Sequence, residues 1–190
     1  MKFKWLIGIF FFMSLYAEAE AVRPPLRPLN GEQFTKMITG ADVIAVGTIN
    51  SVILSKTSAP PSETVMIHAT MAAERILKGD KSIKSIVIEE TFQQFPAENN
   101  EKSVTTQIAG PAPPVGKYRN GDRLLVFLKS LDGSNIYRPL GSGNHDAYLG
   151  IFQITADGVR SDRYRFDEEL TKYGKSEADF LNFIFSIKGE

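Results

Sequence analysis

The chain has 190 residues, with 22 lysines and arginines against 22 aspartates and glutamates, two histidines and no cysteine. This length suits a single domain that can bury its own core. The balanced charge gives no overall attraction to nucleic acid or to an anionic membrane. The absence of cysteine excludes disulfides, thiolate metal sites, cysteine nucleophiles and a lipid anchor on cysteine.

The first residues predict a secretory signal peptide. A basic start at Lys2 and Lys4 precedes an apolar stretch over residues 5–15, and a small-residue Ala-Glu-Ala site ends at Ala19. A membrane-spanning helix needs about 20 apolar residues, so the shorter run favours a cleaved signal. We expect cleavage after Ala19, with Ala21 as the alternative, and a periplasmic or secreted chain without a stable membrane anchor. Export without cysteine favours a bacterial envelope.

The start of the mature chain predicts an extended lead-in followed by a short helix. Residues 22–29 contain three prolines, which favour extended backbone. Asn30 is a helix cap with Gln33 placed for a capping box, and apolar residues follow at helical spacing at Phe34, Met37 and Ile38. We expect this helix to end near Gly40.

Alternating apolar patterns predict a mainly β domain. The expected strands cover residues 42–54, 63–77, 83–92, 123–129, 135–138, 148–155 and 158–161. The first of these is apolar on both faces, which predicts a central position, and Gly47 in its middle predicts a bend, a bulge or a close crossing. Residues 55–62 predict a loop. Residues 93–122 form a polar, proline-broken connection in which only 104–108 is strand-like.

A final helix is predicted after Ser176, which caps it with Asp179 three residues on. Its apolar residues cover about half of the circumference; they are Phe180, Leu181, Phe183, Ile184, Phe185 and Ile187. The favoured interpretation is a helix packed deeply against the β domain. The alternative is that part of this apolar arc docks a partner.

Four phrases of the sequence carry a family resemblance. They are residues 41–49, 74–79, 121–128 and 149–154. In this order and spacing they resemble exported bacterial proteins with an OB-like barrel of the netrin and tissue-inhibitor-of-metalloproteinase type, over about residues 41–160. The resemblance implies a small, closed or partly open OB-like β-barrel with a short N-terminal helix and a C-terminal amphipathic helix. The animal inhibitors present an N-terminal cysteine to the protease zinc, which this chain lacks.

The expected organisation has four parts. Residues 1–19 are the signal peptide, and residues 20–40 are the lead-in with the short helix. Residues 41–166 form the OB-like β-barrel domain, and residues 167–190 carry the C-terminal helix packed on the barrel.

A search for chemistry finds no catalytic residue, no metal site and no cofactor site to predict. In the glycine-rich loop, Ser142 and His145 lack a nucleophile-elbow pattern. His68 and His145 lack a metal-binding spacing. Glu89 and Glu90 are adjacent on a strand, so they face opposite sides and do not form an acid–base pair.

The candidate binding residues lie in the loops expected at the barrel rim, where variation leaves a core undisturbed. They are Asn144, His145, Asp146, Tyr148 and Tyr118. Basic and aromatic residues alternate over 117–119 and 163–166, but acidic neighbours make these solvated faces rather than a nucleic-acid groove.

The sequence therefore predicts an exported, non-enzymatic binding or protein-interaction module. Its expected partner is an unidentified envelope or extracellular protein. One alternative is a small envelope hydrolase or metal-dependent enzyme centred on His145. Another is a structural component of the envelope.

Overall fold

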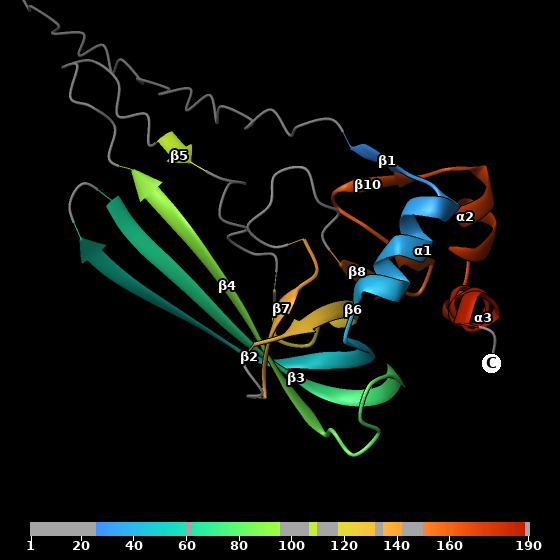
Figure 1. Ribbon diagram of the computed structural model, residues 1–190, viewed down its shortest axis with the longest axis horizontal. Helices are drawn as coiled ribbons and strands as arrows, with labels where there is room; N and C mark the ends of the chain where they lie inside the picture. Colours follow the sequence, from blue (N-terminus) through green and yellow to red (C-terminus); the bar gives the residue numbers. More distant parts are fainter. Residues whose placement is uncertain are drawn as a thin grey trace, which may run out of the picture.

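The computed structural model describes residues 26–59, 62–95, 107–109, 118–131, 135–141 and 150–188 (Figure 1). The strands are β1 Arg27–Leu29, β2 Val43–Ala59, β3 Ser62–Lys78, β4 Ser85–Phe95, β5 Gln107–Ala109, β6 Arg123–Ser130, β7 Ile136–Pro139, β8 Ile151–Thr155, β9 Gly158–Arg160 and β10 Tyr164–Phe166. The helices are α1 Gly31–Gly40, α2 Glu168–Tyr173 and α3 Glu177–Lys188. The prediction of a mainly β chain with a short helix at the start and a longer one at the end is confirmed.

A ring of hydrogen-bonded strands lies at the centre of the fold. Going round it, β2 pairs with β3, β3 with β4, β4 with β7, β7 with β6, and β6 returns to β2. Among the pairings of this ring, the β4–β7 pairing alone is parallel. Strands β8 and β9 continue from the other edge of β6, and β4 also pairs with β5. Separately, β1 pairs with β10 in parallel.

Three strands continue beyond the ring as an arm. Strand β2 pairs with β6 only as far as Thr48, but its pairing with β3 runs on to Ala59 opposite Ser62. Figure 1 shows the outer halves of β2, β3 and β4 leaving the ring together. The expected strand end at residue 54 was too early, because pairing with β3 holds residues 55–59, most of them polar, in extended conformation. We call the outer parts of these three strands the arm.

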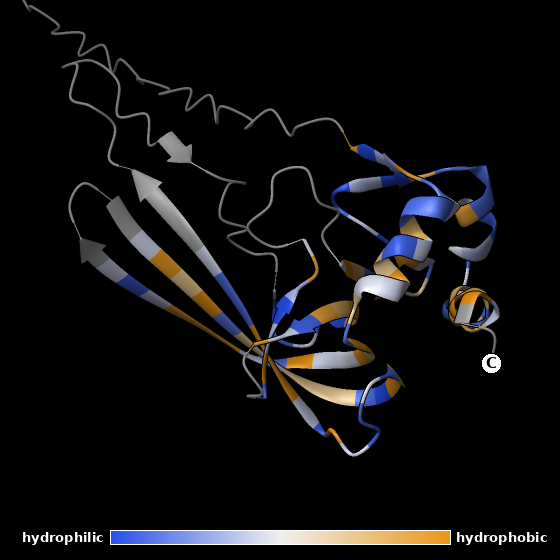
Figure 2. Cartoon of the chain, viewed as in Figure 1, coloured by the Kyte–Doolittle hydropathy of each residue, from blue (hydrophilic) through white to orange (hydrophobic). Residues whose placement is uncertain are grey.

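The two faces of β3 differ in burial, as its alternating sequence predicts. The buried set is Val65, Ile67, Ala69 and Met71, and the half-buried set is Thr64, Met66, His68 and Thr70. We call the first side of the sheet its inner face and the second its outward face. Figure 2 shows both apolar and polar bands along the strands of the arm.

Gly47 lies where the chain passes very close to its neighbour. The register between β2 and β3 shifts between Val46 and Gly47. A Cβ atom added at Gly47 would lie 2.2 Å from the main-chain oxygen of Ala72, a distance that backbone cannot tolerate. The predicted close crossing is confirmed, and any side chain here would push β2 and β3 apart.

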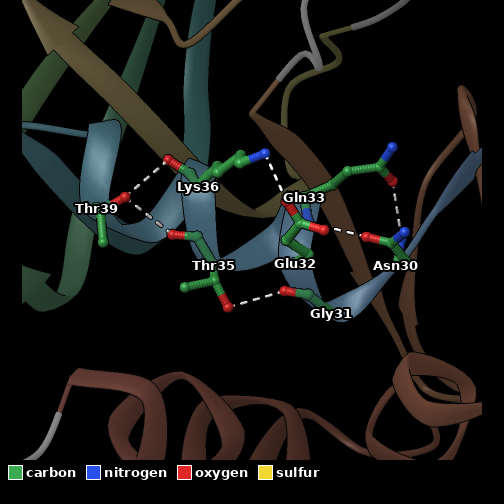
Figure 3. A network of polar contacts seen from close by, with 7 residues as sticks. All are labelled: Asn30, Gly31, Glu32, Gln33, Thr35, Lys36 and Thr39. Carbon is green, nitrogen blue, oxygen red and sulfur yellow. Dashed lines mark hydrogen bonds and ion pairs between the residues drawn. The ribbon is translucent and has the colours of Figure 1, made fainter.

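The start of α1 carries the predicted capping box. The main-chain N–H of Gln33 donates to the Asn30 side chain at 2.9 Å, and the N–H of Asn30 donates to the Gln33 side chain at 3.0 Å (Figure 3). Two main-chain donors that have no partner within the helix are thereby satisfied. The cap fixes where α1 begins and so directs Phe34, Met37 and Ile38 into the core.

An aromatic cluster joins the first and last helices to the sheet. The ring of Phe34 lies 5.4 Å from Phe127, 5.9 Å from Phe152, 5.1 Å from Phe180 and 5.9 Å from Phe183, centroid to centroid. Aromatic pairs at such distances attract beyond the area they bury. The cluster therefore holds α1 and α3 against β6 and β8.

Helix α3 packs deeply, as the favoured interpretation of its apolar arc expected. Phe180, Leu181, Phe183 and Ile184 are buried, and Phe185 and Ile187 are partly buried against the core. Ser176 caps the helix, since its hydroxyl accepts from the N–H of Asp179 at 3.1 Å.

An ion-pair network attaches the first turn of α3 to the sheet. The Arg123 guanidinium bonds Glu177 with two nitrogens and Glu74 at 2.8 Å with a third. Thr48 donates to the other oxygen of Glu74 at 2.6 Å. The Thr48 hydrogen bond is the main reason that the pKa of Glu74 is lowered, with Arg123 adding to it. This network links β2, β3 and β6 to the helix.

Two short elements were not expected from the sequence. Strand β10 lies in a charged stretch, and it forms because β1, far away in the chain, supplies its hydrogen bonds. Helix α2 follows directly, capped by Asp167, whose carboxylate accepts from the N–H of Leu170 at 2.8 Å.

Candidate functional site

Most of the residues predicted for a site lie outside the described part of the chain. Asn144, His145, Asp146 and Tyr148 fall between Gly141 and Gly150, in a range that the structure does not describe.

Tyr118, the remaining predicted residue, is placed in the interior. Its side chain is only 5% exposed, and its hydroxyl donates to the carboxylate of Glu90. Glu90 is itself 2% exposed and is the one charged residue buried among those described. Glu90 lies opposite Ile67 of β3 and therefore on the inner face. The pair occupies the interior beneath the arm, and a surface role for Tyr118 is not what its burial supports.

Burial is the main influence on the pKa of Tyr118. It raises the pKa of the Tyr118 phenol well above its ordinary value, and the negative charge and hydrogen bond of Glu90 raise it further. The positive charge of Arg163 acts in the opposite direction. The phenol therefore stays protonated in the folded chain and remains a donor to the carboxylate.

Replacing Tyr118 with Phe tests this arrangement. The variant removes a donor from a buried carboxylate, and we expect its free energy of unfolding at pH 7 to fall by about 2 kcal/mol. A folded-state pKa above the unfolded one means that stability is complete below the unfolded pKa of about 10 and is lost as pH rises beyond it. The loss approaches about 1.4 kcal/mol per pH unit in the wild type, and Tyr118→Phe removes this slope.

Urea unfolding at pH 7, 10 and 11 measures both effects. Tyr173→Phe is the matched control, because Tyr173 stacks on Phe183 at 4.2 Å and has no carboxylate partner among the described residues. That control should keep the alkaline slope. A Tyr118→Phe variant as sensitive to high pH as the wild type would contradict the assignment.

On the outward face, a row of side chains crosses four strands. Ile53 of β2 lies opposite His68 of β3, which lies opposite Glu89 of β4. The His68 Nε2 atom is 3.1 Å from one oxygen of Glu89, and the Arg138 guanidinium of β7 donates to the other oxygen at 2.9 Å. We call Ile53, His68, Glu89 and Arg138 the outward row. The prediction that Glu89 and Glu90 face opposite sides is confirmed, as is a half-buried His68.

Glu89 organises the charge of this row. The hydrogen bond from Arg138, followed by the one with His68, holds the pKa of Glu89 below its ordinary value. The carboxylate is therefore ionised at neutral pH. It compensates the positive charge of Arg138 and holds the guanidinium in position. Arg138 and His68 keep 47% and 32% of their side chains exposed, so both remain available to a partner.

The side chains of the outward row do not provide the ligand set of a metal centre. Within the described ranges, no three histidine, aspartate or glutamate side chains gather closely enough to hold a metal ion. His68 and Glu89 provide one imidazole and one carboxylate, and the carboxylate is already bonded to Arg138. What the row offers is a fixed set of donors and an acceptor beside an exposed apolar side chain.

The arm also exposes two large apolar residues at its edge. Ile53 is 60% exposed and Leu54 is 58% exposed. Ile53 lies on the outward face, while Leu54 lies opposite Ile67 on the inner face. Both side chains border the edge of β2, one on each face of the sheet. The alternation of β2 was visible in the sequence, but its exposure depended on β6 leaving the edge at Thr48.

Comparisons with known proteins give no relative for this chain: no family model, no curated protein and no solved structure matches it. Among the described residues, no helix has the length and apolar character needed to cross a membrane.

Proposed function

We propose that this chain is an exported, non-enzymatic module that binds a protein of the cell envelope or the extracellular space. The observation that carries the proposal is the outward row, in which the exposed Ile53 adjoins fixed but accessible polar groups at His68 and Arg138. Protein interfaces combine an apolar anchor with a surrounding set of hydrogen-bonding groups, and arginine is among their favoured residues.

The charge of the row favours a protein over a nucleic acid as partner. Nucleic-acid sites present basic surface to phosphates. Here Arg138 already faces Glu89, and the whole chain carries no net charge. A partner surface that itself mixes charges and apolar groups fits this row better.

We also propose that the ring is an OB-like barrel of the netrin and metalloproteinase-inhibitor type. A five-strand ring, closed by the return of β6 to β2 and with β7 lying between β4 and β6, supports this assignment. OB-folds bind ligands on the face of their second and third strands and in the adjoining loops. The second and third strands of this ring are β3 and β4, which carry His68 and Glu89. The proposed barrel and the proposed binding face therefore agree.

Capture of the partner from envelope extract tests the binding function. The wild-type protein serves as bait, and the Arg138→Ala variant should lose the captured protein, with affinity at least about tenfold weaker. Leu26→Ser is the matched control, because Leu26 is exposed on the N-terminal lead-in away from the row. Thermal unfolding of each bait verifies that the arm is intact.

The alternative of an enzyme centred on His145 is separated in the same experiment. Baits with His145→Ala and Asp146→Ala should capture the same protein as the wild type. Equal capture by wild-type and Arg138→Ala baits, with loss in the His145 variant, would overturn the outward row as the binding surface.

A further inference from the structure

The outer edge of β2 in the arm is an unpaired strand edge over the described residues. The hydrogen bonds of β3 show which main-chain N–H and carbonyl groups of β2 point towards this edge. The N–H of Ala73 donates to Lys84 beside β4, so odd-numbered residues of β3 point their main-chain groups towards β4. Even-numbered residues, such as His68, then point theirs towards β2. Ile53 lies opposite His68, so its main-chain N–H and carbonyl groups point towards β3.

The main-chain hydrogen bonds of Ile49 to residues 121 and 122 independently show which groups of β2 point away from β3. The N–H of Ile49 donates to Asp122 at 2.9 Å and its carbonyl accepts from Gly121 at 2.8 Å, so these groups point away from β3. The register then shifts between Ile49 and Ser51, which reverses the alternation. After this shift the main-chain groups of Val52, Leu54 and Lys56 point outwards.

No other described strand pairs with this outward edge beyond Thr48. A row of free N–H and carbonyl groups on an extended, apolar edge is a template for another strand. Proteins usually protect such an edge with charges, bulges or prolines. The bulge at residues 49–51 and the charge of Lys56 bound a stretch, residues 52–55, that has none of these and carries Ile53 and Leu54 with most of their surface exposed.

We propose that a second copy of this chain pairs with this edge, antiparallel and with Ile53 at the two-fold axis. Ile53 then lies opposite Ile53 of the second copy. Val52 lies opposite Leu54 on both sides of the axis. Both chains contribute outward-pointing main-chain groups at residues 52 and 54, so the hydrogen bonds of an antiparallel pair can form in both directions. The two arms become one continuous sheet.

The charges on this edge fit a second copy. In this register Lys56 lies opposite Asn50, so the two lysines of the pair are about 20 Å apart along the strands. The chain has no net charge, and like chains therefore approach without long-range repulsion. Self-pairing places apolar side chains of the second copy beside Ile53 on the outward face and beside Leu54 on the inner face, and it leaves the outward face itself open. This inference goes beyond the proposed partner binding and does not depend on it.

Charge substitution at the axis tests the register directly. Sedimentation equilibrium of the purified protein should show a reversible dimer within concentrations up to about 1 mM. Ile53→Lys and Ile53→Glu each place like charges opposite one another and remove buried apolar area, so each should weaken self-association at least about tenfold. An equimolar mixture of the two variants should associate as a heterodimer more strongly than either does alone.

A charge placed elsewhere on the surface is the control for the Ile53 variants. Leu26→Lys adds the same charge at an exposed residue away from the edge and should leave the dimer unchanged. A wild-type chain that stays monomeric over this range overturns the proposal. So does a dimer that survives both Ile53 variants, or variants whose mixture fails to associate. Because no envelope extract is present, failure here leaves the partner-binding experiment standing.

Discussion

The Phe34→Ala variant should lose about 3–5 kcal/mol of unfolding free energy, the cost of deleting a fully buried aromatic ring. Phe34 is 0% exposed and contacts four other phenylalanines from β6, β8 and α3. The vacated space borders three separate elements, so no single side chain can move in to fill it. At about 2–4 °C per kcal/mol for a chain of this length, the melting temperature should fall by roughly 10 °C.

Thermal and urea unfolding measure this loss of stability, with two further variants for comparison. Phe34→Leu keeps much of the volume and should lose only about 1–2 kcal/mol, which gives a result even where the alanine variant does not fold. Leu26→Ala changes a residue that is 49% exposed and should shift stability by less than about 0.5 kcal/mol. An alanine variant as stable as the leucine variant would show that the cluster does not hold α1 and α3 together.

Gly158→Ala should be about as damaging, for a different reason. Gly158 has φ +112°, in the left-handed region that costs other residues about 1–2 kcal/mol. Its added Cβ would also lie 2.1 Å from the carbonyl oxygen of Gly174, which accepts the N–H of Val159 at 2.8 Å. The β8–β9 hairpin must then move away from the end of α2. The combined cost is about 3–5 kcal/mol.

Gly121→Ala separates the backbone cost of a positive φ from the cost of the steric clash. Gly121 also has a positive φ, +88°, but its added Cβ would meet nothing within 4 Å. This variant should lose only the backbone cost of about 1–2 kcal/mol. The difference between the two variants, measured by urea unfolding, gives the energy of the contact between Gly158 and Gly174. Equal losses would mean that the hairpin moves freely.

Local patterns in the sequence predicted what local physics decides. Asn30 and Gln33 form their capping box within one turn, and the Ser176 hydroxyl caps α3 by accepting from the N–H of Asp179. The opposite facing of Glu89 and Glu90 follows from strand geometry alone. Each of these features needs only residues that are close neighbours in the chain.

Features that depend on pairing between distant strands were beyond the sequence. The outward row requires β4 to pair in parallel with β7, which brings Arg138 to Glu89. The length of the arm depends on where β6 leaves β2. Tyr118 looked like a rim residue because its neighbours in sequence are polar, but its hydroxyl finds Glu90 in the interior. Neither alternation nor local composition carries this information.

The aromatic cluster also sets the order in which the chain can be completed. Phe34 comes early in synthesis, whereas Phe180 and Phe183 come much later, and their rings meet in one place. Contacts between residues so far apart in sequence slow folding, because the chain entropy is lost before they form. A nascent chain whose α3 has not yet emerged from the ribosome therefore leaves Phe34 partly uncovered, and the cluster can close only after α3 has emerged.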